Sequence, residues 1–127
     1  MLNQDQITNN KIKTAKFDLE ERTSKFGEKI VLLCQSLSTT FVSEIIIKQL
    51  VRSATSVGAN YMEANGADSK RDFRNKLSIC KKEAKETYHW LRMLIALFPS
   101  KSVELQGLRK ESHELILIFS AIIKKLY

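Results

Sequence analysis

Hydrophobic residues recur along most of the chain at alternating steps of three and four, the spacing of one face of an α-helix. The pattern predicts four such segments, which run from Asp18 to Leu37, from Ser43 to about residue 65, from Ser69 to Phe98, and from about Ser102 onwards. Only short polar breaks separate them. Because short connections make successive helices antiparallel neighbours, we predict an all-α fold, an antiparallel up-down four-helix bundle.

Residues with capping preferences mark the ends of these segments. Asp18, Ser43 and Ser69 are expected to start the first three helices, and Asp72 stands at the capping-box position after Ser69. The second helix should end at Asn65-Gly66, residues that tolerate the left-handed conformation, and the third should stop before Pro99.

Each predicted helix carries one row of residues that should face the core. The rows consist of Leu19, Thr23, Phe26, Ile30, Leu33 and Leu37; Ile47, Leu50, Ala54, Val57, Tyr61 and Ala64; Phe73, Leu77, Cys80, Ala84, Thr87, Leu91 and Leu94; and Leu105, Leu108, Ser112, Leu115, Phe119, Ile122 and Leu126. Small residues around the second row, Gly58 among them, should let a neighbouring helix approach closely. Folding the second helix back on the third about residue 67 pairs Val57 with Leu77 and Ala54 with Cys80.

Residues 1–16 are polar and rich in Asn and Gln, so we predict a flexible N-terminal arm ahead of a bundle formed by residues 17–127. The arm lacks the apolar region of a signal peptide. The longest nearly apolar run, Leu115 to Ile123, is about half a membrane span. Cys34 and Cys80 fall in hydrophobic helical patterns and are expected to be reduced, buried thiols. These features favour a cytoplasmic protein with no membrane association.

Two segments are apolar all the way round the helix, Ile30–Cys34 and Leu115–Phe119. A helix in a four-helix bundle keeps an outer face, so we expect these outer faces to contact another subunit, with Ile116 and Ile118 in the interface. The alternative is a broad core with a few exposed aliphatic side chains. The pattern favours self-association.

The chain carries a formal net charge of +7, and its charges are unevenly distributed. From Ser69 to Phe98 there are eight basic and three acidic residues, a net charge of +5. One flank of this helix, which we call the basic face, is expected to bind phosphates without reading bases; a solvated helix surface is the alternative. Its members are Arg71, Arg74, Lys81, Lys85 and Arg92. The opposite flank mixes Ile79 and Trp90 with carboxylates, as a subunit contact does.

Catalytic and metal-binding patterns are weak in this sequence. Glu86 and His89 have the Glu-x-x-His spacing of di-iron bundles, but the other histidine, His113, is preceded at that spacing by Lys110. Neither a catalytic triad nor a zinc tetrad can be assembled, so we expect no enzyme activity, cofactor or metal. Asn60 and Glu63 lie on one polar stripe and are expected to form a structural hydrogen-bond network with a lysine of the third helix. An enzymatic alternative would rest on Glu63, Glu83 and Glu86 alone.

The segment Gln49–Ala64, QLVRSATSVGANYMEA, resembles a signature of the four-helix bundle proteins encoded in 23S ribosomal RNA intervening sequences. Matching pieces of the next helix are Ser69–Phe73, Lys76–Ile79, Lys82–Ala84 and Glu86–Leu91. The resemblance extends from about Phe26 to Leu97. Ser56-Val57-Gly58 replaces the Ser-Ile-Pro of a sister group, which places the chain in the branch without proline.

The resemblance implies assembly as a cyclic homopentamer. It also implies kinship with the accessory proteins of diversity-generating retroelements, basic pentameric barrels that bind nucleic acid beside a reverse transcriptase. A reverse transcriptase is thereby implied as a protein partner, and no catalytic residue is implied. The leading hypothesis is a non-enzymatic oligomer that binds RNA or DNA non-specifically through the basic face. The alternative is a protein-interaction scaffold, a ring-shaped homo-oligomer with no direct nucleic-acid role.

Overall fold

The computed structural model describes the backbone of residues 4–126 and the side chains of residues 19–126. Over this range the chain forms the helices α1 (Gln4–Gln35), α2 (Phe41–Asn65), α3 (Lys70–Leu97) and α4 (Ser102–Lys125), with a short 3-10 turn, η1 (Pro99–Lys101), before α4. The described residues contain no strand, which confirms the prediction of an all-α fold.

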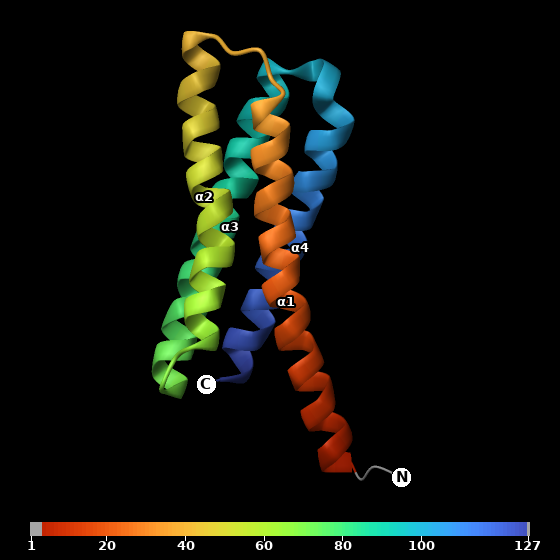
Figure 1. Ribbon diagram of the computed structural model, residues 1–127, viewed down its shortest axis with the longest axis vertical. Helices are drawn as coiled ribbons and strands as arrows, with labels where there is room; N and C mark the ends of the chain where they lie inside the picture. The colour runs from red at the N-terminus through yellow and green to blue at the C-terminus, as the bar shows by residue number, and fades with distance from the viewer. Residues whose placement is uncertain (1–3, 127) are drawn as a thin grey trace.

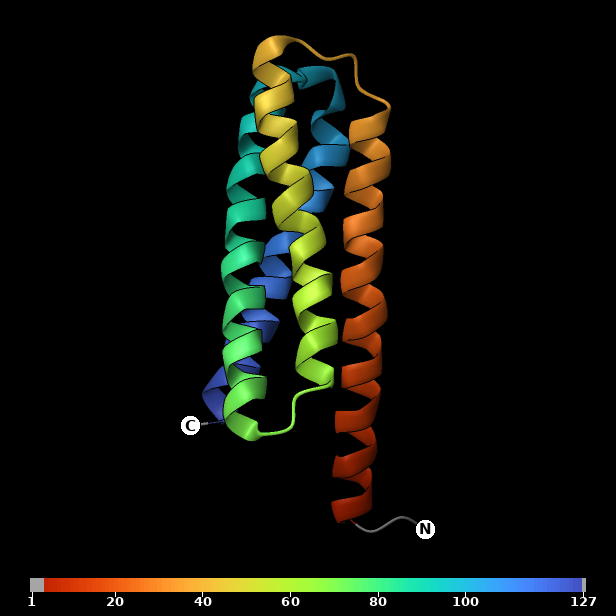
Figure 2. The same cartoon turned by 60° about the vertical axis from the view of Figure 1, so that its left-hand side comes forward.

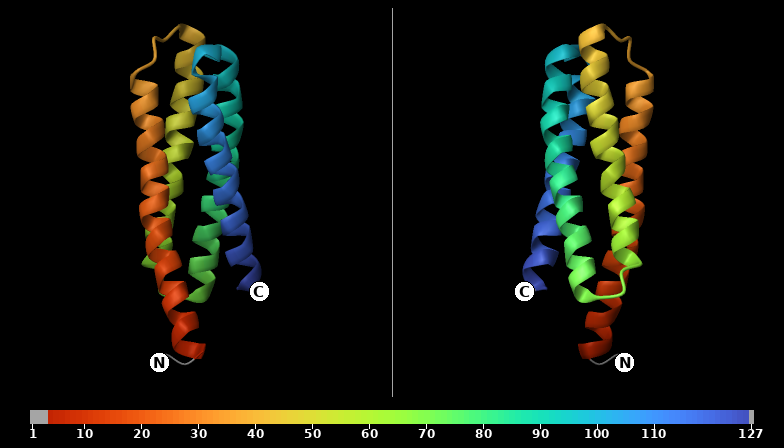
Figure 3. Two further views of the ribbon diagram at one scale, coloured as in Figure 1. Left: turned by 90° about the vertical axis from the view of Figure 1, so that its right-hand side faces the viewer. Right: turned by 90° about the vertical axis from the view of Figure 1, so that its left-hand side faces the viewer.

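The helices lie side by side, and the chain reverses direction at each connection (Figure 1, Figure 2). The N-terminal part of α1 extends beyond the end of the other helices (Figure 3). α2 packs against α1 and α3, and α3 packs against α4, whereas α1 and α4 touch each other far less. The bundle is therefore closely packed between α1 and α2, α2 and α3, and α3 and α4, and it is more open between α1 and α4.

Helix starts were predicted with mixed success. Ser69 caps α3 as expected, because its hydroxyl accepts a hydrogen bond of 3.0 Å from the backbone N–H of Asp72. The predicted cap of α2 is wrong: Thr40 is the N-cap, and Ser43 is the third helical residue. The Thr40 hydroxyl accepts from the Ser43 N–H at 3.3 Å, and the Ser43 hydroxyl accepts from the Thr40 N–H at 2.7 Å. This reciprocal pair satisfies two N–H groups that the first turn cannot bond internally.

One further boundary differs from expectation, the start of α1. The backbone of α1 is helical from Gln4, well before Asp18. The side chains of residues 1–18 lie outside the described residues, so the division into a flexible arm and a bundle stays a prediction. α2 ends at Asn65 as predicted, but Gly66 adopts a φ of −92°, and no described residue has a positive φ. The tolerance of Gly66 for the left-handed conformation is therefore not used, because a right-handed turn already lets its N–H donate to the carbonyl of Glu63.

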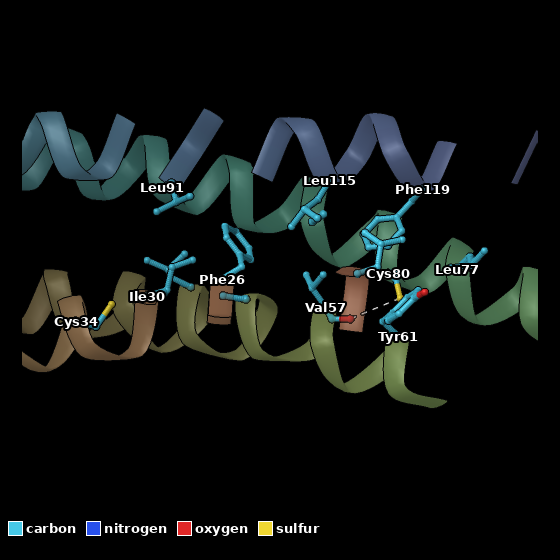
Figure 4. Close-up of a cluster of buried hydrophobic side chains, with 14 of the residues drawn as sticks. Phe26, Ile30, Cys34, Val57, Tyr61, Leu77, Cys80, Leu91, Leu115 and Phe119 are labelled. Atoms are coloured by element: carbon cyan, nitrogen blue, oxygen red, sulfur yellow. Dashed lines mark hydrogen bonds between the residues drawn. The ribbon is translucent and has the colours of Figure 1, made fainter. Parts of the chain in front are cut away.

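The predicted rows do form the core (Figure 4). From Leu77 to Leu94 the α3 row is fully buried, and the middle of every other row is buried as well. The first row departs from expectation at its end, where Cys34 is buried and Leu33 and Leu37 are only partly buried. The α-helical spacing was therefore sufficient to identify most of the interior.

Polar contacts inside the core fix the register between α2 and α3. The Cys80 thiol donates to the carbonyl of Val57 at 3.6 Å (Figure 4). The Thr87 and Ser53 hydroxyl oxygens lie 2.9 Å apart. The predicted partner of Cys80 was Ala54, which lies about one helical turn from Val57. The predicted register is therefore displaced by about one turn.

α1 and α2 come close where two glycines face the partner helix. A Cβ atom on Gly58 would lie 3.4 Å from the backbone carbonyl of Thr23, and one on Gly27 would lie 3.6 Å from the carbonyl oxygen of Ala54. The expectation that small residues let a neighbour approach closely therefore holds at Gly58.

Candidate nucleic-acid interface

Two of the three acidic residues of α3, Glu83 and Glu86, are engaged on the side that faces α2. Arg52 of α2 forms ion pairs with both Glu83, at 3.2 Å, and Glu86. Lys76 donates to Glu63 of α2 at 2.6 Å. The hydrogen bond that Arg52 donates to Glu86 raises the pKa of Arg52, and the one that Lys76 donates to Glu63 raises the pKa of Lys76. The carboxylates Glu83 and Glu86 are thus matched by a cation of α2 and do not offset the basic face.

The basic face lies on the other flank of α3, the one that faces α4. Arg71, Lys85 and Arg92 are exposed, and Arg74 and Lys81 are half-buried. Within the described part of the chain, Arg71, Lys81, Lys85 and Arg92 form no ion pair with an acidic side chain. A row of unpaired cations is the arrangement that can take up phosphates.

Tyr88 belongs to the same row but was not predicted. The residues 81, 85, 88 and 92 follow steps of four and three, so Tyr88 lies between Lys85 and Arg92 on one helix face. Arg109 of α4 stacks over its ring at 3.8 Å from the centroid, and its Nε donates to the carbonyl of Tyr88 at 3.2 Å. His113 of α4 lies beside the same ring, with centroids 5.8 Å apart. Tyr88 was not predicted as part of this row because the prediction considered basic residues alone.

The acidic residues of α4 lie towards α1. Arg22 of α1 forms a bidentate hydrogen bond to Glu111, at 2.8 and 2.6 Å, and a further bond of 2.8 Å to Glu114. The bond to Glu111 raises the pKa of Arg22. Arg109 and Glu111 are two positions apart and therefore lie on nearly opposite sides of the helix. This arrangement leaves cationic side chains of both helices along the α3–α4 side.

The predicted polar network exists in part. Lys76 is the lysine of the third helix expected to reach Glu63. Asn60 does not join that pair, because its amide donates to the Ser56 carbonyl one turn earlier at 2.8 Å. Asn60 and Glu63 therefore stabilise separate local contacts.

The residues predicted for an oligomer interface do not form one patch. Trp90, Ile116 and Ile118 pack partly against the core, and Ile79 is 37% exposed. Ile116 and Ile118 are two positions apart and point to nearly opposite sides of α4. The more exposed apolar residues of the two all-apolar segments are Leu32, at 65%, and Leu117, at 55%.

A groove of about 1200 Å³ runs between α1 and α4 where these helices separate. Phe26, Leu33 and Leu108 supply apolar lining, and Lys25, Lys29, Glu104 and Glu111 supply charged lining. The Arg22–Glu111 ion pair lies within it. The groove is thus lined by a mixture of apolar, basic and acidic side chains.

Possible metal ligands are dispersed. Glu86 binds Arg52, whereas the exposed ring of His89 lies 4.9 Å from the Trp90 ring. Residues 19–126 hold no group of three His, Cys, Asp or Glu side chains arranged for a metal ion. Among the helices described, none has the length and hydropathy to cross a membrane.

The fold and its charged surface define a helical-bundle protein with a basic side face. The family model of the 23S rRNA-intervening sequence protein matches residues 15–121, and the chain belongs to this family. It is similar to the 1.70 Å crystal structure of a protein with unknown function from the S23 ribosomal protein family of Bacteroides thetaiotaomicron VPI-5482. The sequence identity is 34% and the TM-score 0.76, over 86% of this chain and 97% of that chain. A comparison with curated proteins found no match.

Proposed function

We propose that this protein is a non-enzymatic homo-oligomer of antiparallel up-down four-helix bundles that binds RNA or DNA without base specificity. The observation that carries the proposal is the separation of charge on α3. Glu83 and Glu86 pair with Arg52 on one flank, while Arg71, Lys81, Lys85 and Arg92 on the other have no acidic partner among the described residues. Contacts of this kind release counterions, so affinity should fall steeply with salt.

The test replaces four residues of the basic face together, Arg71, Arg74, Lys81 and Lys85, each by Gln. Removing up to four phosphate contacts should flatten the slope of log affinity against log salt by about 3. The readout is fluorescence anisotropy of a labelled oligonucleotide over a salt series.

A matched control removes the same charge elsewhere, by changing the exposed residues Lys29, Lys48, Lys110 and Lys125 to Gln. If the location of the charge matters, the control keeps most of the parental slope. Equal slopes for the parent and the basic-face variant would contradict the proposal.

Assembly is the second part of the proposal. The exposed Leu32 and Leu117 give each copy apolar surface that another copy can cover, in keeping with a cyclic homopentamer. The alternative function, a ring-shaped protein-interaction scaffold with a partner such as a reverse transcriptase, is favoured by other exposed apolar residues. Phe41 is 80% and Val103 89% exposed. Capture of a protein partner that survives nuclease treatment would favour the scaffold.

A further inference from the structure

Tyr88, Arg109 and His113 form a compact group beside the basic face, which we call the Tyr88 cluster. The Arg109 guanidinium carbon lies 3.8 Å from the centroid of the Tyr88 ring, and the His113 ring is tilted by 40° from it. Tyr88 and Arg109 are half-buried, whereas His113 is exposed. The cluster thus offers planar groups at the surface, held by contacts between α3 and α4.

We propose that the Tyr88 cluster stacks an unpaired base, so that the protein prefers single-stranded nucleic acid to duplex. The inference rests on the proposed function, because the phosphates of the same strand would lie on the basic face. Aromatic rings and guanidinium planes are the groups on which splayed bases stack. A base inside a duplex has both faces covered by its neighbours, so it cannot stack on these rings and planes.

The position of the cluster supports this reading. Lys85 and Arg92 lie about 4.5 Å and 6 Å of helix rise from Tyr88, one on either side. Cations therefore flank the planar groups along one row. A strand following α3 would place its phosphates on the cations and a base over the cluster.

Arg109 is held in place but keeps hydrogen-bonding capacity. Its Nε donates to the Tyr88 carbonyl at 3.2 Å. Its two terminal nitrogens form no hydrogen bond or ion pair with a described residue. The α4 carboxylates Glu111 and Glu114 are bound to Arg22 of α1 instead. The fixed guanidinium can therefore both stack on a base and donate to it.

The test compares an unstructured oligonucleotide of roughly ten nucleotides, carrying one 2-aminopurine, with a duplex of the same length. The strand is used as RNA and as DNA. The variants are Arg109→Lys, which keeps the charge and removes the plane, and His113→Ala, which changes an exposed side chain. His89→Ala is the matched control. His89 is exposed like His113, but its ring lies beside Trp90 and outside the Tyr88 cluster.

We expect both cluster variants to bind the single strand about tenfold more weakly, with an unchanged salt slope, because a stacked base contributes affinity without a phosphate contact. They should also lose part of the 2-aminopurine quenching. Duplex binding and the control should match the parent. Comparing the RNA and the DNA strand identifies the preferred sugar.

Equal parental affinity for single strand and duplex, or cluster variants that bind the single strand like the parent, would overturn the inference and leave the proposed function standing. If the parent binds neither probe at low salt, the proposed function fails and the inference falls with it. The two failures are therefore distinguishable.

Discussion

Cys34 and Cys80 are buried among apolar side chains, and their surroundings disfavour the thiolate. Burial raises the pKa of Cys34 to about 11 and that of Cys80 to about 12, from an ordinary value of 9.0. It also raises the pKa of Tyr61 to about 12. These groups stay protonated in the folded protein at pH values where the unfolded chain ionises.

This difference predicts loss of stability at alkaline pH. Above pH 9.0 the unfolded thiols release protons that the folded thiols keep until about 11 or 12. The unfolded state then binds fewer protons, so the free energy of unfolding should fall as pH rises through this window. Urea unfolding of the parent and of Cys80→Ala, at neutral and alkaline pH, measures the effect. The variant should lose part of the alkaline decrease, and an identical decrease in both proteins would exclude Cys80 as a source.

Burial of single residues could be predicted from the sequence, whereas several contacts could not. Cys80 follows the helical row, so its burial required no knowledge of its partners. Thr40 and Ser43 have similar capping preferences, so only the backbone geometry identifies the cap. Tyr88 was missed because the interpretation of the α3 flank considered charge alone, although its spacing from Lys85 and Arg92 was visible.

At the scale of elements, hydrophobic spacing located the helices but not their register. The rows of α2 and α3 repeat at each turn, so sliding one helix by a turn still matches apolar residues with apolar residues. The Cys80–Val57 and Thr87–Ser53 contacts discriminate between these registers. Such pairings depend on the shape of the connection between the helices, which the pattern does not encode.

Two glycines make the close approach of α1 and α2 testable. A Cβ at Gly58 would contact the Thr23 backbone, whereas one at Gly107 would meet nothing within 4 Å. Gly107→Ala should therefore raise the free energy of unfolding by about 0.5–1 kcal/mol through helix propensity alone. Gly58→Leu should destabilise by about 1–3 kcal/mol, because the larger side chain forces the helices apart.

Thermal and urea unfolding of both glycine variants would measure these changes. Gly58→Ala serves as an intermediate, since an added methyl is only in ordinary contact with Thr23. A Gly58→Leu protein as stable as the parent would show that the helices have room between them.

At the scale of the whole molecule, exposed apolar residues predict self-association. Leu32 and Leu117 are more than half exposed, so replacing each by Glu should leave the core of one copy intact. We expect the parent to exceed its monomer mass of 14.6 kDa in light scattering and the double variant to shift towards it. Circular dichroism checks that the variant stays helical. A parent that is monomeric at micromolar concentration would remove the oligomer from the proposal.

Because α1 and α4 make few contacts, this side of the bundle is sensitive to ionic strength. Arg22 spans it through Glu111 and Glu114, at positions partly open to solvent. Dissolved ions screen such bridges, just as they compete for the cations of α3. Raising the ionic strength should thus weaken the ion-pair link between α1 and α4, while the packing of α1 against α2 holds the first helix in place. Under the proposed function, the same rise in ionic strength would also release a bound nucleic acid.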